Sequence, residues 1–502
     1  MSTSKSFIQV YRFFEKAFIS ALTLLSPESC VQSSLKYSHP KLTVQNTIYD
    51  LSNTKIHIIA FGKAAISMVL GAEKGLGDSV IAGGIASVPF GSLLPTNSKI
   101  QFFPGAKNNL PDSDSEETTK KIEEYLQKLG SEEIVLFLIS GGGSALLPAP
   151  IEGITLEEKL KVIKILATNG ATIQELNTVR IALSRVKGGK LGRLIKGKAI
   201  SLIISDIIGD PIELIASGPT VSSIENQKES AFSILQRFCN DKELIPKNVW
   251  KILEKQLTTE NQVLSNIQNL IVASNSIFVK TVVNQLESET SNEIKASIIS
   301  TKFEGDATES GKALFNKALS AAAKLLKSNL WNIEIFAGET TVSFPSPLPT
   351  NANGGRNQEM ALSFFHELIK YQIESFDNPE NLSTGIACLG TDGQDGPTNA
   401  TGAFCSSNDL QGLNLVDLKT LKSEVELHLS SKTSYNFWSN FNSSKNHVKL
   451  GKTGHNLMDS HSKKVYKPIT ENRVQKETFK KKLTRKLRYL QNITLKIKAQ
   501  MG

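Results

Sequence analysis

Short apolar segments, separated by stretches with helical periodicity, set the strongest constraint on the fold of this chain. Residues 56–61, 134–139 and 199–204 are almost entirely apolar. Strands covered by helices on both faces show such continuous runs, whereas half-exposed strands alternate apolar and polar residues. The intervening segment 155–168 has apolar residues at helical spacing. This pattern predicts an α/β fold with a buried parallel sheet.

The second half of the chain also alternates predicted strands and helices, without repeating the sequence of the first half. Residues 358–371 are predicted as a helix and 384–389 as a strand. A length of 502 residues exceeds what one hydrophobic core usually serves. The polar stretch near 257–269 is the expected boundary. We therefore expect two α/β domains with mainly parallel sheets and helices on both faces, over residues 1–260 and 261–460.

The net charge of +9 is confined to the C-terminal tail. Residues 461–502 hold 13 of the 57 basic and 2 of the 48 acidic side chains, so residues 1–460 carry a net charge of −2. A body so close to neutrality is a poor candidate for nucleic-acid binding, which requires clustered cations. The tail is predicted to be a disordered extension; a weak amphipathic helix that contacts an anionic membrane or RNA is the alternative.

Cysteine usage and hydropathy bear on location. The four cysteines, Cys30, Cys239, Cys388 and Cys405, are far apart and form no CxxC pair, which favours a reducing compartment. No apolar stretch approaches the ~18 residues of a membrane span. We expect a cytoplasmic protein. The alternative is mitochondrial, because an apolar helical face near the N-terminus, with Arg12 beside it, is also typical of a presequence.

Residues suited to phosphate binding follow two of the predicted strands. Lys63 comes directly after the first strand, and Ser140, Gly141, Gly142, Gly143 and Ser144 follow the strand at 134–139. Ligands bind beyond the carboxyl ends of parallel strands, and successive glycines let backbone N–H groups approach an anion. The alternatives to phosphate binding are that Lys63 only begins a helix and that the glycine loop only makes a flexible turn.

Carboxylates and one arginine occupy the other loops. Asp206 and Asp210 follow the strand at 199–204, and Asp392 lies in a glycine-rich loop. Such carboxylates can hold Mg²⁺, or they can simply cap turns. Arg356 lies between a glycine pair and a helix, where its guanidinium could neutralise a phosphoryl group; the alternative is an ion pair with Glu359.

This set of groups indicates phosphoryl transfer, which depends on positioning and charge neutralisation. Neither a P-loop nor a Gly-x-Gly-x-x-Gly fingerprint is present at the glycine loop. A hydroxypyruvate- or tartronate-handling oxidoreductase would need such a dinucleotide fingerprint. A third hypothesis, an RNA-binding module, would depend on the basic tail.

Several of these segments resemble the glycerate kinases of the MOFRL type, in order along the chain from about residue 7 to about 459. The segments in the first half are 61–64, 140–146, 176–180, 187–191 and 205–220, and those in the second half are 337–342, 354–359 and 390–398.

The resemblance implies transfer of the γ-phosphoryl group of ATP to D-glycerate, with Mg²⁺ as cofactor and 2-phosphoglycerate as product. It also implies an active site in the cleft between two domains. The family's proposed catalytic residues fall on Lys63 and Arg356. We assign ATP binding to residues 140–144, Asp206 and Asp392, and the metal to Asp206 and Asp210. No oligomeric state is indicated.

The end of the chain departs from the family pattern. Residues 453–459 keep most of a Thr-Gly-Thr-Asn-x-Met-Asp motif, with His455 in place of a threonine, but the polar segment that begins at Ser460 replaces the apolar strand expected next. The tail is either a genuine extension or an error in the translated end of the gene. On either account, it is predicted to be dispensable for catalysis.

Overall fold

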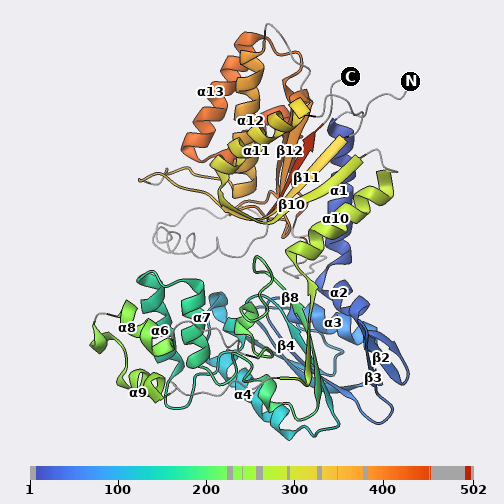
Figure 1. The fold of residues 1–502 in the computed structure, drawn as a ribbon, viewed down its shortest axis with the longest axis vertical. Helices are drawn as coiled ribbons and strands as arrows, with labels where there is room; N and C mark the ends of the chain where they lie inside the picture. The colour runs from blue at the N-terminus through green and yellow to red at the C-terminus, as the bar shows by residue number, and fades with distance from the viewer. Residues whose placement is uncertain are drawn as a thin grey trace. The chain divides into compact units, whose positions relative to one another are not determined.

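The computed structural model describes residues 7–222, 230–239, 241–255, 264–290, 294–324, 331–347, 349–376, 383–451, 453 and 492–498. The chain forms two compact units (Figure 1). Leu25–Ser274 make up one, here called the Lys63 unit; Met1–Leu24 together with Asn275–Gly502 make up the other, here called the Arg356 unit. Each unit contains a six-stranded sheet. None of the helices in the described residues is long and apolar enough to span a bilayer.

The large sheet of the Lys63 unit is parallel throughout, as the apolar runs predict. Its strand order is β6-β5-β4-β7-β8-β9, and every neighbouring pair is parallel. The strands are β4 (Ile56–Phe61), β5 (Ile81–Pro89), β6 (Ile100–Gly105), β7 (Ile134–Ile139), β8 (Lys198–Ile204) and β9 (Ile267–Ala273). A small antiparallel sheet joins β1 (Lys36–Ser38), β2 (Lys41–Val44) and β3 (Thr47–Asp50).

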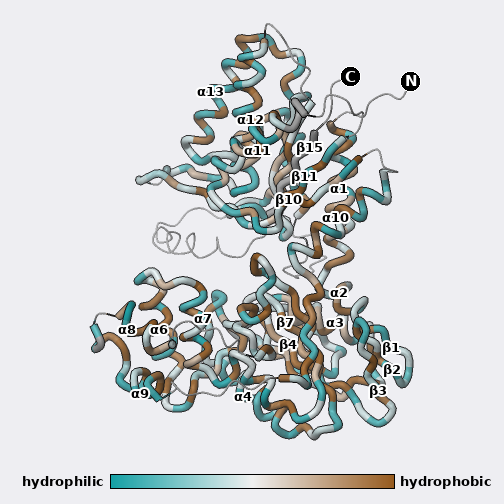
Figure 2. Tube along the Cα trace, in the orientation of Figure 1, coloured by the Kyte–Doolittle hydropathy of each residue, from teal (hydrophilic) through white to brown (hydrophobic). Residues whose placement is uncertain are grey.

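Alternate residues of each central strand enter two different cores. Ile58 of β4 packs with Met68 of α3, whereas Ile59 and Phe61 pack with Ile122 of α4. Both faces are therefore apolar, which explains the continuous runs in the sequence and the band of hydrophobic colour along β4 and β7 (Figure 2). The covering helices are α2 (Pro27–Ser34), α3 (Ala65–Leu76) and α4 (Ser113–Lys128).

A group of helices beside the sheet has a core of its own. Val162, Val179, Leu235 and Val249 contribute to it, one from each helix. These helices are α6 (Leu156–Thr168), α7 (Ile173–Ala182), α8 (Ala231–Phe238) and α9 (Lys247–Lys255) (Figure 1).

The sheet of the Arg356 unit is mixed, which corrects the expectation of mainly parallel strands here. Its order is β10-β11-β15-β12-β13-β14; the β10–β11 pair is parallel and the other pairs are antiparallel. The α/β class itself is confirmed. The strands are β10 (Ile294–Asp306), β11 (Trp331–Thr341), β12 (Thr384–Gly390), β13 (Gly402–Ser406), β14 (His447–Val448) and β15 (Asn492–Lys498).

Helices cover both faces of this sheet (Figure 1). One face is covered by α11 (Ala307–Lys324) and α12 (Arg356–Glu374), with α13 (Leu415–Ser431) packed against α12, and the other by α1 (Phe7–Leu24) and α10 (Asn275–Thr290). The N-terminal helix packs here through aromatic contacts: Phe18 meets Phe278 with ring centroids 5.3 Å apart, and Tyr11 stacks on Phe404 at 4.0 Å.

The division of the chain therefore differs from the expected boundaries. Residues 1–24 group with the second unit, and the boundary expected at 260 lies at Ser274, because β9 completes the parallel sheet beside β8. The prediction of a disordered tail is corrected in part: residues 492–498 form β15, which pairs with both β11 and β12. The rest of the predicted disordered tail lies outside the described residues.

Candidate active site

Lys63 and the glycine loop lie together because the neighbouring parallel strands β4 and β7 end at the same edge of the sheet. The backbone N–H of Lys63 donates to the carbonyl of Gly141 (2.9 Å), and the N–H of Ala64 donates to Oγ of Ser140 (3.0 Å). The turn that carries Lys63 is thus fixed to the loop that was predicted to bind phosphate.

Two glycines are required by the side chains that lie against them. Gly142 has φ +78°, and a Cβ at this position would lie 3.0 Å from Cγ of Lys63. A Cβ on Gly141 would overlap the carboxylate of Asp206. The structure therefore brings Lys63, the glycine loop and Asp206 together, as their positions at strand ends predict.

The far end of the glycine loop begins the short helix α5 (Gly143–Leu146). Oγ of Ser144 lies 3.0 Å from Oγ of Ser217, in a turn where Ala216 and Ser217 both have positive φ. Non-glycine residues rarely adopt this conformation, and buried examples cluster at functional sites. No role in the site was predicted for Ser217.

Asp206 and Asp210 are the carboxylates that the sequence predicts to hold a metal. Within the described residues, no group of three or more His, Cys, Asp or Glu side chains could hold a metal ion. Asp206 lies against the glycine loop, and Oδ1 of Asp210 is buried without a hydrogen-bond partner in the described structure. Mg²⁺ in kinases is commonly held by one or two carboxylates plus substrate phosphates, so these two residues fit the ion.

Arg356 begins α12 and is only 4% exposed. Its Nη1 donates to Oε1 of Glu339 at 2.7 Å. Glu359, the alternative partner considered from the sequence, instead pairs with Nζ of Lys432 at 2.8 Å. The guanidinium of Arg356 therefore pairs with a carboxylate at the end of β11, and the predicted partner Glu359 pairs with another cation.

Two carboxylates of the 390–398 loop, both in the Arg356 unit, have different environments. Asp395 caps α12: its carboxylate accepts the backbone N–H groups of Asn357 (3.0 Å) and Gln358 (2.9 Å). Asp392 accepts one from Gln394 (2.9 Å). Burial, with the nearby charge of Asp395, raises the pKa of Asp392 to about 6, and Arg356 opposes this shift.

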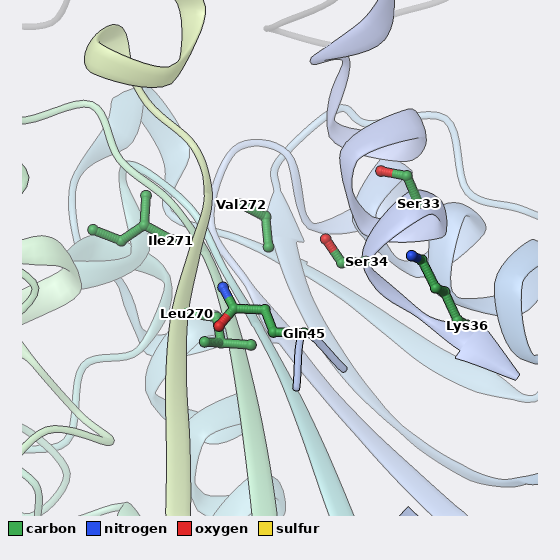
Figure 3. A pocket seen from close by; sticks show the side chains of 7 residues that line it. All are labelled: Ser33, Ser34, Lys36, Gln45, Leu270, Ile271 and Val272. Carbon is green, nitrogen blue, oxygen red and sulfur yellow. The ribbon is translucent and has the colours of Figure 1, made fainter. Parts of the chain in front are cut away.

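One pocket of the Lys63 unit lies away from these groups. It has a volume of about 300 Å³ and is lined by Ser33, Ser34, Lys36, Gln45, Leu270, Ile271 and Val272 (Figure 3). None of the site residues predicted from the sequence lines it.

A parallel α/β sheet that presents a lysine, a glycine loop and a carboxylate at its carboxyl edge holds the kinds of group that phosphoryl transfer by a kinase requires. Comparison with known proteins agrees. The MOFRL family matches residues 332–459, and a domain of unknown function, DUF4147, matches residues 13–254.

The chain is 33% identical to a glycerate kinase of Rattus norvegicus, with 88% of this chain and 91% of that protein covered. It is also 33% identical to a glycerate 2-kinase of Pyrococcus horikoshii, with 83% and 89% covered. The crystal structure of a glycerate kinase from Thermotoga maritima superposes with a TM-score of 0.72 at 25% identity, over 98% of this chain and all of that one. The chain belongs to the glycerate kinase family and is a kinase. The resemblance drawn from the sequence motifs is confirmed, and the oxidoreductase alternative is not supported.

Proposed function

We propose that this kinase transfers the γ-phosphoryl group of ATP to D-glycerate and releases 2-phosphoglycerate. The observation that carries the proposal is the convergence of Lys63, the glycine loop and Asp206 at one sheet edge, in a chain whose relatives include glycerate kinases. The regiochemistry is supported by a relative named glycerate 2-kinase.

Each group has a role that follows from its chemistry. The glycine loop is suited to hold nucleotide phosphates through backbone N–H groups, and the ammonium of Lys63 is suited to neutralise charge on the transferred phosphoryl group. Mg²⁺, when bound by Asp206 and Asp210, would offset the charge of the phosphates. In the Arg356 unit, Arg356 can neutralise phosphoryl charge, and Asp392 either contributes to ATP binding or accepts the proton of the attacking hydroxyl. The expected cleft between the domains stays a prediction, as does the cytoplasmic location.

The test is incubation of the purified protein with ATP, Mg²⁺ and D-glycerate, followed by ³¹P NMR of the product. A phosphorus resonance coupled to one proton identifies phosphate on the secondary hydroxyl, and coupling to two protons identifies the primary hydroxyl. We expect the first. Formation of 3-phosphoglycerate would contradict the regiochemistry, and no ATP consumption with D-glycerate would contradict the substrate. Omission of Mg²⁺ is expected to abolish turnover.

A further inference from the structure

A cluster of lysines lies beside the glycine loop, and the reaction proposed above gives none of them a role. It consists of Lys159 on α6 and of Lys187 and Lys190, which follow α7. Nζ of Lys187 lies 3.4 Å from the carbonyl oxygen of Ser144, at the end of the glycine loop. We call these three residues the lysine cluster.

Lys159 is an unusual residue to find in a helical core. It shares the buried face of α6 with Val162 and Leu166 and is only 5% exposed. Its Nζ has no hydrogen-bond partner in the described part of the chain. A buried ammonium without a partner is costly, so an aliphatic residue at this position would stabilise the protein more.

The other two lysines are held by backbone carbonyls and not by acids. Nζ of Lys190 donates to the carbonyls of Ile181 (2.8 Å) and Ser184 (2.6 Å), and Lys187 is 2% exposed. In the residues that the structure describes, none of the three forms an ion pair with a carboxylate. Burial, with the nearby charge of Arg180, lowers the pKa of Lys187 to about 7, and burial with the charge of Arg193 lowers that of Lys190 to about 8. Burial, with the charges of Lys187 and Lys190, also lowers the pKa of Lys159.

The backbone that carries the cluster is fixed to the turn at Ala216–Gly218. The N–H of Gly188 donates to the carbonyl of Ser217 (2.9 Å), and that of Gly189 donates to the carbonyl of Gly218 (2.7 Å). The same turn contacts the glycine loop through Ser217 and Ser144. The lysines are therefore positioned in advance, with the amine of Lys187 next to the glycine loop.

We propose that the lysine cluster binds an oxyanion of the reactants, either the carboxylate of glycerate or a phosphate of the nucleotide, with the unpartnered Nζ of Lys159 as one of its donors. The proposal rests on the function proposed above and names specificity-determining residues for it. A bound oxyanion would supply the partner that Lys159 lacks and would offset the repulsion among the neighbouring cations.

The experiment compares wild-type protein with Lys159→Met and with the control Lys164→Met, an exposed position on the same helix. Dissociation constants are measured by calorimetry for D-glycerate, for ATP and for inorganic phosphate, and each protein is melted without ligand. We expect Lys159→Met to weaken the binding of one reactant by about 10- to 100-fold and to leave Tm unchanged or higher. Lys164→Met should bind both reactants as the wild type does.

The outcomes distinguish the source of the anion. A loss of affinity confined to D-glycerate identifies its carboxylate as the anion that the cluster binds. A loss of affinity for ATP and inorganic phosphate identifies a nucleotide phosphate instead. Unchanged binding of both reactants by Lys159→Met would overturn the proposal, and so would a lowered Tm with unchanged affinities, because Lys159 would then be structural. If the wild type phosphorylates D-glycerate and Lys159→Met binds both reactants normally, only the role of the lysine cluster is refuted. If the wild type does not phosphorylate D-glycerate, the proposed function is refuted.

Discussion

At the scale of single residues, the candidate site requires glycines, because a side chain at these positions would occupy the space of functional groups. Gly141 leaves room for the carboxylate of Asp206, and Gly142 for the side chain of Lys63. A side chain at either position would displace a group that we place in the reaction.

We expect Gly142→Val to weaken ATP binding by at least about 10-fold, because it forces a branched residue into a left-handed conformation and crowds Lys63. Calorimetric titration with ATP measures the effect. Gly91, with φ +80° and open space around its Cβ position, is a matched control, because Gly91→Val carries the backbone strain without the crowding. Equal ATP affinities for the two variants would assign the loop a structural role.

Arg356→Lys tests the planar guanidinium in the Arg356 unit. We expect kcat to fall by about 100-fold, because lysine keeps the charge but loses the fork that can bridge two oxygens. Arg356 also pairs with Glu339, so melting must accompany the kinetics. A large fall in kcat at constant Tm supports catalysis, whereas a lowered Tm with kcat preserved at low temperature would reduce Arg356 to a structural partner of Glu339.

At the scale of elements, the strand ends of the Lys63 unit could be predicted from the sequence, but the lysine cluster could not. Continuous apolar runs predicted β4, β7 and β8. Because ligands bind beyond the carboxyl ends of parallel strands, these strands then indicated Lys63, the glycine loop and Asp206 as site residues. Lys159 left only a weak signal, a lysine within the apolar face of the predicted helix at 155–168. Its charged neighbours include Arg180 of α7, Lys187 and Lys190, and these residues are not close to it in sequence.

The lysine cluster also predicts how stability depends on pH. Folding lowers the pKa values of Lys187 and Lys190 to about 7 and about 8, below the usual ~10.4 of the unfolded chain. Between these values the unfolded chain binds more protons, so the free energy of unfolding from this source rises as pH increases from about 7 to 10. Urea unfolding of the wild type and of Lys187→Met/Lys190→Met at several pH values isolates this contribution. An identical pH slope for the two proteins would show that both lysines are charged in the folded state.

At the scale of the whole molecule, the sequence predicted two α/β units but placed their boundaries incorrectly. The aromatic face of α1 was visible in the sequence, but its partners, Phe278 and Phe404, are distant along the chain. The alternating segment Asn492–Lys498 lies within a basic tail whose charge obscured it, and its backbone pairing with β11 and β12 defines it as a strand.

The tail is therefore no longer expected to be dispensable. Deletion of residues 492–502 removes the strand between β11 and β12 and leaves two rows of backbone groups unpaired. We expect insoluble protein or a large fall in Tm, whereas deletion of residues 499–502 alone should be tolerated. Soluble protein with unchanged Tm after the longer deletion would show that β15 contributes nothing to stability.

The most direct test of the central claim, that the sheet edge at Lys63 is a phosphoryl-transfer site, is kcat for D-glycerate in Lys63→Met at saturating ATP. The exposed Lys55→Met serves as control, and Tm is measured on both variants. We predict that kcat falls by at least about 1,000-fold in Lys63→Met, with Tm unchanged, because the variant loses the cation that neutralises phosphoryl charge in the transition state. Near-normal turnover by a well-folded Lys63→Met protein would contradict the account and remove this edge of the sheet from the chemistry.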